Sequence, residues 1–205
     1  MQKIYLLLLC MLFLFTLTPT QVRALERCKA LAPEIRKAHM FYFGVDFPWW
    51  YSVGQAEKES LCRHSVLSSD GIGSEGFAQI TFRWWRKKLE KEGITEIKSI
   101  PNHAKAQAFI NKYEYDRTVC KKLFEMYQRY NGGALVSQEL MRANSCKWED
   151  GFKGCKRKDV CVWVTSKGCK QYRNACDINY EYGLKIFQLG QKYNPGMIEK
   201  VYAFW

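Results

Sequence analysis

The sequence lacks the features that indicate several common classes of protein. It contains no internal repeat, low-complexity tract or flexible linker, so neither a repeat array nor a chain of several domains is expected. Few stretches alternate apolar and polar residues, which disfavours a sheet protein. No metal-binding or nucleotide-binding motif occurs, so we expect no metal and no cofactor. The 205 residues instead predict one mainly α-helical domain.

The N-terminal segment has the layout of a secretory signal peptide. Lys3 precedes an apolar run over Ile4–Leu17, and an A-x-A-like cleavage site ends at Ala24. The apolar run is short for a membrane span, although an uncleaved N-terminal anchor is the alternative interpretation. We therefore expect residues 1–24 to be removed. The mature domain, residues 25–205, is then periplasmic or secreted and has no stable membrane span.

The cysteines predict disulfides rather than a zinc site. Cys10 lies inside the apolar run, and the other eight form an even set in a chain that we expect to be exported, which favours four disulfides in an oxidising compartment. No C-x-x-C pair occurs, and the three histidines lie outside the cysteine cluster. Eight cysteines allow 105 pairings, so the sequence leaves the connectivity open. The eight are Cys28, Cys62, Cys120, Cys146, Cys155, Cys161, Cys169 and Cys176.

The formal net charge of +12 suits an anionic partner. For an exported protein we expect an anionic envelope polymer or a membrane surface rather than nucleic acid. The alternative is that the charge serves only solubility.

Helical periodicity extends over most of the chain. We expect helices from Pro48 to about Ser60, from about Phe77 to Leu89, after a cap at Asn102, over Tyr115–Tyr130, over Leu135–Ala143, and over a last stretch that places Tyr182, Ile186, Leu189 and Tyr193 on one face. Residues 144–176 are polar and carry five of the cysteines. This segment is expected to be a disulfide-rich insertion with a short strand over Val160–Val164.

Glu59 is the first candidate for a catalytic group. At about 100° per residue it borders the apolar face that Trp49 and Ala56 define, whereas Glu57 points elsewhere. A carboxyl group against apolar surface has its ionised form disfavoured, so its pKa rises and it can hold a proton near neutral pH. A proton donor to a glycosidic oxygen needs this property. A structural ion pair is the alternative role for a glutamate on such a face.

Three motifs occur in order around this residue. Glu59-Ser60 is followed by a glycine-rich turn over residues 73–80, with the sequence G-S-E-G-F-A-Q-I, and later by Y-N-G-G over residues 130–133. This combination resembles the lysozyme-like lytic transglycosylase family, whose members carry a Glu-Ser pair, a G-A-x-G-L-M-Q turn and an A-Y-N-x-G box. The resemblance is carried by residues from about 49 to 133, and Arg129 stands where the family has a small residue.

The resemblance implies a lysozyme-like helical domain and a set of site residues. Glu59 is then the catalytic acid and base. The residues inferred to bind the glycan are Ser60, Ser69, Gly76, Gln79, Tyr130 and Asn131. Ser68 competes with Ser69 for one serine position of the family. Gln79 is expected just inside the following helix, where its amide would reach hydroxyl or acetamido groups.

The resemblance also implies the reaction. A lytic transglycosylase cuts the β-1,4 bond between N-acetylmuramic acid and N-acetylglucosamine in peptidoglycan and forms a 1,6-anhydro end without consuming water. Enzymes of this kind serve secretion, conjugation or phage-like machines, and an envelope-spanning machine is therefore a further expected partner.

Three alternatives remain open at this stage. A goose-type lysozyme, a hydrolase of similar fold, would need a second carboxylate, for which Asp70 and Glu75 are candidates. A non-catalytic glycan-binding component of the envelope would not need Glu59 as an acid. A basic antimicrobial protein or toxin is favoured only by the charge and the cysteines.

Overall fold

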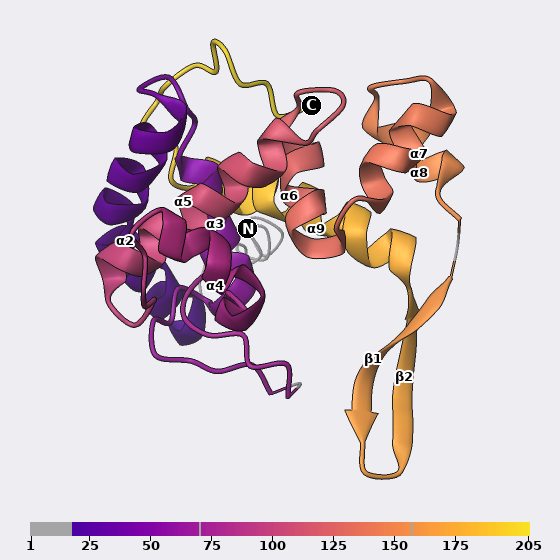
Figure 1. Ribbon diagram of the computed structural model, residues 1–205, viewed down its shortest axis with the longest axis horizontal. Coiled ribbons are helices and arrows are strands. Elements are labelled where there is room, and N and C mark those ends of the chain that lie inside the picture. Colours follow the sequence, from indigo (N-terminus) through magenta and orange to yellow (C-terminus); the bar gives the residue numbers. More distant parts are fainter. Residues whose placement is uncertain (1–17, 70, 157) are drawn as a thin grey trace, which may run out of the picture.

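The computed structural model describes residues 18–69, 71–156 and 158–205. In this part of the chain there are eight α-helices and one two-stranded sheet (Figure 1). The elements in order are α2 (Pro19–Phe43), α3 (Trp50–Ser60), α4 (Phe82–Lys91), α5 (Ile100–Asp116), α6 (Leu123–Gly132), α7 (Leu135–Ala143), α8 (Trp148–Gly154), β1 (Asp159–Thr165), β2 (Gly168–Asn174) and α9 (Ala175–Gln191). The prediction of a mainly helical chain is confirmed.

Helix α9 is packed along both α3 and α6, while α2 is packed against α5 and α3 (Figure 1). Two glycines allow α3 and α9 to approach closely. A β-carbon on Gly54 would lie 2.5 Å from the backbone nitrogen of Gly190, a distance that no real side chain could occupy. This contact between antiparallel helices sets the last turn of α3 against the middle of α9, where the candidate site lies.

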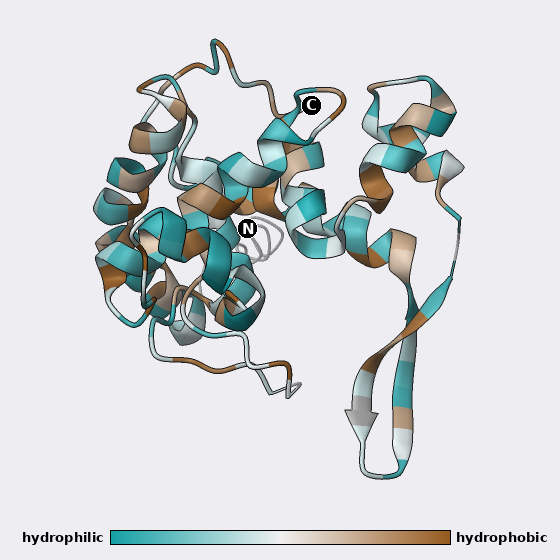
Figure 2. Cartoon of the chain, viewed as in Figure 1, coloured by the Kyte–Doolittle hydropathy of each residue, from teal (hydrophilic) through white to brown (hydrophobic). Residues whose placement is uncertain are grey.

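The core is built from apolar side chains of these packed helices. In α3, Trp50, Tyr51, Val53 and Ala56 are each at most 1% exposed. Burial on all sides of α3 fixes its position and the direction of the side chains in its last turn. The hydropathy colouring shows polar residues on the outward surfaces of the surrounding helices, α4 being largely hydrophilic (Figure 2).

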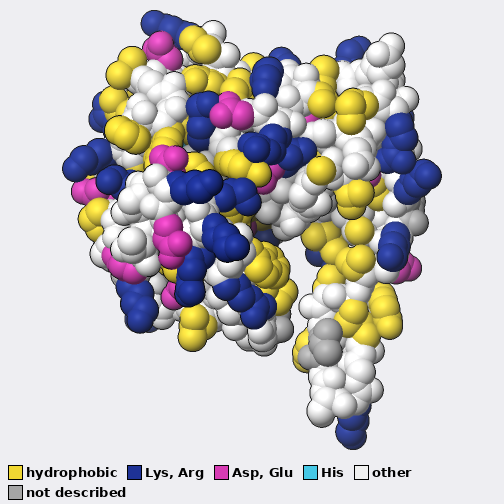
Figure 3. Space-filling model, in the orientation of Figure 1, with side chains coloured by type: hydrophobic (Ala, Val, Ile, Leu, Met, Phe, Trp, Pro, Cys, Tyr) yellow, Lys and Arg dark blue, Asp and Glu magenta, His cyan; other side chains and the backbone are white. Residues whose placement is uncertain are grey.

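A second group of elements follows the core helices. Helices α7 and α8 pack on each other, and β1 pairs with β2 in an antiparallel hairpin that runs from Asp159 opposite Asn174 to Thr165 opposite Gly168. The apolar residues of the hairpin lie mainly on β1 (Figure 2). The predicted strand is confirmed, and the hairpin stands apart from the helical body with open space between them (Figures 1 and 3).

The prediction that the eight cysteines outside the apolar run form disulfides is confirmed. The four pairs are Cys28–Cys62, Cys120–Cys146, Cys155–Cys176 and Cys161–Cys169. The first pair joins α2 to the residue that lies just beyond α3, so it tethers the end of the helix that carries Glu59.

The predicted cleavage site at Ala24 lies inside α2. The side chain of Thr18 caps this helix, accepting a hydrogen bond from the Gln21 backbone, and Ala24 is 1% exposed. Lys3, Cys10 and the whole apolar run lie outside the described residues. Among the described residues, no helix combines the length and the apolar character needed to cross a membrane.

Three predicted helices were wrong in extent. The helix expected after a cap at Asn102 begins earlier, at Ile100, and its N-cap is Ser99. The helix expected from Phe77 begins only at Phe82, because the preceding residues form a tight turn in which Glu75 and Ile80 exchange backbone hydrogen bonds. The helix expected over Tyr115–Tyr130 is interrupted between α5 and α6. There the carboxylate of Glu125 accepts hydrogen bonds from two loop N–H groups, those of Val119 and Cys120, and Val119 is 44% exposed instead of lying on a buried stripe.

Candidate active site

Glu59 lies in the last turn of α3 and is partly buried. Burial raises the pKa of its carboxyl group above the ordinary value of 4.5, since an ion loses hydration there. A hydrogen bond from Tyr182 and the nearby charge of Lys58 act in the opposite direction and lower the pKa. The net effect is a carboxyl group that keeps its proton to higher pH than an ordinary glutamic acid.

Glu57 points away from Glu59, as the helical spacing predicts, but it is also buried, at 8% exposed, which the spacing did not predict. Its carboxylate accepts hydrogen bonds from the ammonium of Lys192 at 2.8 Å and from the hydroxyl of Tyr193 at 2.7 Å. These partners lie at and just beyond the C-terminal end of α9. Glu57 therefore ties α3 to the end of α9, and Glu59 is the acid on the side of the helix where the candidate site lies.

Two tyrosines accompany the Glu59 carboxyl group. The Tyr182 hydroxyl, from α9, donates a hydrogen bond to Oε1 of Glu59. Burial, together with the charge of Glu59, raises the pKa of both Tyr182 and Tyr130 well above the ordinary value for tyrosine, so both hydroxyls remain protonated donors. The ammonium of Lys58 lies 5.8 Å from the centre of the Tyr182 ring.

The Glu59 carboxyl group opens onto a cavity of about 410 Å³ between α3, the end of α6, α9 and the base of β2. Its lining includes Tyr182 and Asn131, so the structure brings one predicted binding residue to the same cavity as the predicted acid. The charged residues of the lining are Lys58, Glu59, Arg173, Glu181 and Lys185. Glu181 is the other carboxylate there, and it forms an ion pair with Arg173 at 2.7 Å.

The glycine-rich turn over residues 73–80 is held by three different helices. Ser60 of α3 donates a hydrogen bond to the Phe77 carbonyl at 3.0 Å, and Tyr130 of α6 donates one to the Ala78 carbonyl at 2.6 Å. His103 of α5 accepts a hydrogen bond from the Ala78 N–H at 3.2 Å. The three predicted motifs therefore meet at one short stretch of backbone.

His103 holds this turn as a neutral imidazole. Nε2 accepts from Ala78, and Nδ1 lies 3.0 Å from the Ile97 carbonyl, to which it donates. Burial lowers the pKa of His103 to about 4, so the ring carries no charge at neutral pH.

Gly76 is required by this packing. Its φ angle is +72°, and a β-carbon there would lie 2.1 Å from the His103 ring. We expect Gly76→Ala to lower the free energy of unfolding by about 3 kcal/mol, from backbone strain together with overpacking. Gly73 is the matched control, because its φ angle is +80° but a β-carbon there meets no atom within 4 Å. Gly73→Ala should cost only about 1 kcal/mol. Urea unfolding of the oxidised proteins measures both, and equal stabilities would contradict this explanation.

The structure places the other predicted residues as follows. Gln79 is not inside a helix: its φ angle is +49°, and its amide donates to the Gly76 carbonyl at 2.9 Å, within the turn. Ser69 is exposed in the loop before the turn. Asp70 lies outside the described residues. Glu75 belongs to the turn and lines a separate cavity of about 310 Å³ beside His64.

Sequence reasoning missed three residues of this region. Tyr182 was predicted only as one position on an apolar helical face, although it donates to Glu59 across 123 positions of sequence. His103 and Arg173 also come from distant segments. No local signal identifies such partners, because only the packing of α5, β2 and α9 brings them to the turn or the cavity.

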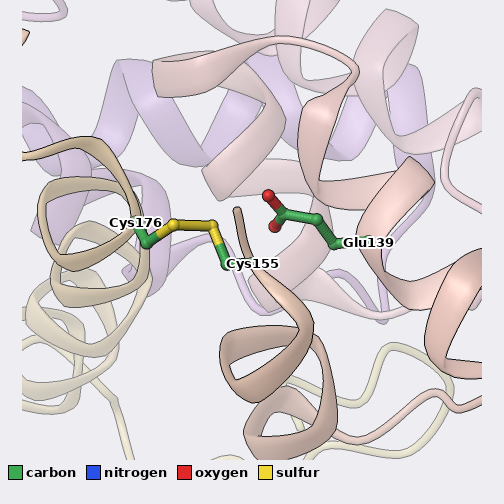
Figure 4. Close-up of side chains that lie close together, drawn as sticks. All are labelled: Glu139, Cys155 and Cys176. Carbon is green, nitrogen blue, oxygen red and sulfur yellow. A yellow bond between two sulfur atoms is a disulfide. The ribbon is translucent and has the colours of Figure 1, made fainter. Parts of the chain in front are cut away.

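One group of side chains has the proximity of a metal site but not its chemistry. Glu139, Cys155 and Cys176 have potential ligand atoms within 4.8 Å of one another. The two sulfur atoms are bonded to each other in a disulfide (Figure 4), so neither is a thiolate that could bind a metal ion.

No protein-family model, curated protein or solved structure was found to match this chain.

Proposed function

We propose that this chain is an exported peptidoglycan lytic transglycosylase with a lysozyme-like helical fold, in which Glu59 is first the general acid and then the general base. The observation that carries the proposal is the partly buried Glu59 carboxyl group, with its raised pKa, beside a cavity of about 410 Å³. The resemblance of the three motifs supplies the substrate and the reaction. Four disulfides are compatible with a periplasmic or secreted location.

The reaction needs two proton transfers at one carboxyl group. Protonated Glu59 gives its proton to the glycosidic oxygen as the bond from that oxygen to C1 of N-acetylmuramic acid breaks. The acetamido oxygen of the same sugar bonds to C1, and the positive charge is shared between the oxygen and the nitrogen of the cyclic oxazolinium ion that forms. The Glu59 carboxylate then takes the proton of the C6 hydroxyl, whose oxygen attacks C1 and displaces the acetamido group. The 1,6-anhydro product forms, and Glu59 is protonated again.

The surrounding groups fit these two steps. Before the first transfer, burial favours the protonated form of Glu59 by raising its pKa, and after it the Tyr182 hydroxyl stabilises the carboxylate through its hydrogen bond. Tyr130 and Ser60 hold the backbone of the glycine-rich turn rather than donating to Glu59, so their proposed contribution is to position the turn.

Hydrolysis is the second candidate, because a second carboxylate, Glu181, lines the cavity with Glu59. A hydrolase would use such a group to activate water. Its ion pair with Arg173 gives Glu181 a structural role and favours the transglycosylase.

Mass spectrometry of the fragments released from purified cell-wall sacculi tests the proposal. We expect muropeptides that end in 1,6-anhydro-N-acetylmuramic acid, which are lighter by one water than hydrolysis products. Reducing ends would identify a hydrolase instead, and no release of fragments would contradict both reactions.

A further inference from the structure

A second and larger cavity adjoins the cavity of Glu59. Its volume is about 700 Å³, and it lies among α7, the segment after α8, the start of β1 and the N-terminal end of α9. Asn131 and Ile178 line both cavities, so they form a shared wall. A ligand bound at Glu59 therefore lies next to this second space, for which the proposed reaction has given no role.

The second cavity combines an apolar lining with an excess of positive charge. Leu135, Val160 and Ile178 are among its apolar residues, while its cations are Arg142, Lys156 and Lys158. All three cations are exposed and therefore available to a ligand. Uncharged sugars need no such cations, whereas carboxylates bind them directly.

The one carboxyl group of the lining is Glu139, which is 5% exposed. Burial raises its pKa, and its Oε2 accepts a hydrogen bond from the Tyr180 hydroxyl at 3.0 Å. Glu139 is therefore a buried group held by the protein, and it offsets only part of the positive charge of the walls.

The walls are held together covalently. The Cys155–Cys176 disulfide joins the segment after α8 to the first turn of α9 and lies beside Glu139 (Figure 4). The backbone N–H of Ala175 donates to the Lys158 carbonyl at 2.8 Å, and Asn174 caps α9. These links fix the cavity before a ligand binds, which lowers the entropy cost of binding.

We infer that this cavity binds the peptide stem of the glycan substrate, a short acidic peptide attached to N-acetylmuramic acid. The inference rests on the proposed function, which puts that sugar at Glu59. The stem leaves the sugar beside the bond that is cut, and it carries carboxylates for the cations and methyl groups for the apolar walls. The disulfide-rich insertion thereby gains a role: it distinguishes glycan that bears peptide from glycan without it.

A binding experiment tests the cavity without requiring catalysis. The probe is the free tetrapeptide stem of peptidoglycan, titrated by calorimetry into the Glu59→Gln protein. We expect saturable binding, weakened about fivefold or more by the double substitution Lys156→Gln and Lys158→Gln, because two charged contacts are lost.

The matched control is Lys105→Gln with Lys200→Gln, which removes the same charge at two exposed residues, one in α5 and one in the segment after α9. The affinity of this control for the peptide should stay within about twofold of that of the parent protein. Salt screens the interaction between the peptide and distant lysines, so only lysines that contact the peptide should affect its binding. An absence of binding, or equal weakening by both double substitutions, would overturn the inference.

A second measurement separates this inference from the proposed function. The kcat/KM for peptide-bearing glycan is divided by the kcat/KM for glycan stripped of its stems by an amidase. We expect this ratio to fall about fivefold in the Lys156→Gln, Lys158→Gln protein and to remain constant in the control. An unchanged ratio in an active enzyme would overturn the stem site alone. If neither glycan is cut, the proposed function fails, and calorimetry still decides whether the cavity binds the peptide.

Discussion

Glu59→Gln should reduce the release of muropeptides from purified sacculi by about a thousandfold, the middle of the range that general acid–base catalysis contributes. Glutamine has nearly the shape of glutamate, and its carbonyl oxygen can still accept the hydrogen bond from Tyr182. What it lacks is the transferable proton. The initial rate of fragment release by the purified protein measures the effect.

Glu57→Gln is the matched control, since it changes the same residue type two positions earlier in the same helix. Glu57 binds Lys192 and Tyr193 rather than lying at the cavity of Glu59, so its substitution should leave the rate within about threefold of the wild type. Equal losses from both substitutions would contradict the assignment of the acid.

Stability supplies an independent check on the Glu59→Gln protein. The pKa of Glu59 is raised by folding, so its contribution to stability is fully present below the ordinary glutamic acid pKa and is lost as the pH rises through the folded-state pKa. At neutral pH the glutamine variant should therefore melt at the same temperature as the wild type or higher. A clearly lower melting temperature would mean that lost activity reflects unfolding.

Tyr182→Phe should lower kcat about tenfold and move the alkaline limb of the pH–rate profile to higher pH. Its hydroxyl donates to the Glu59 carboxylate and lowers the pKa of Glu59, so its removal raises that pKa further. The reaction starts from protonated Glu59, and activity is lost as the pH rises through this pKa. The rate falls because the acid is less well oriented and its carboxylate less well stabilised.

Tyr130→Phe distinguishes orientation from electrostatics. The Tyr130 hydroxyl donates to the Ala78 carbonyl, not to Glu59, so its loss should lower activity without moving the alkaline limb. Profiles of kcat against pH for both variants provide the comparison. A limb that stays fixed or moves to lower pH in Tyr182→Phe would contradict the role assigned to Tyr182.

Local sequence patterns predicted those features that depend on local interactions. The helix over Leu135–Ala143 and the strand around Val160 follow from periodicity and from flanking turn residues, and both occur in the structure. The region of Phe77 shows the limit of this reasoning. Its apolar residues are buried in a turn, because Gly76 and Gln79 both adopt positive φ angles and stop a helix from forming.

The candidate site was predictable only in part. Glu59 could be singled out because helical geometry places it at the border of the apolar face that Trp49 and Ala56 define. Its partner Tyr182 depends on the close approach of α3 and α9 at Gly54 and Gly190, a tertiary contact that leaves no local pattern. The disulfide pairs were undetermined for the same reason, since they depend on which segments meet in space.

The most direct test of this account is the pKa of the Glu59 carboxyl group itself. The ¹³C resonance of that carboxyl, assigned as the signal absent from the Glu59→Gln protein, can be followed by NMR across a pH titration. We expect a midpoint above 4.5, because burial outweighs the hydrogen bond from Tyr182 and the charge of Lys58. A midpoint at or below 4.5 would show an ordinary ionised carboxylate at neutral pH and would contradict Glu59 as the proton donor.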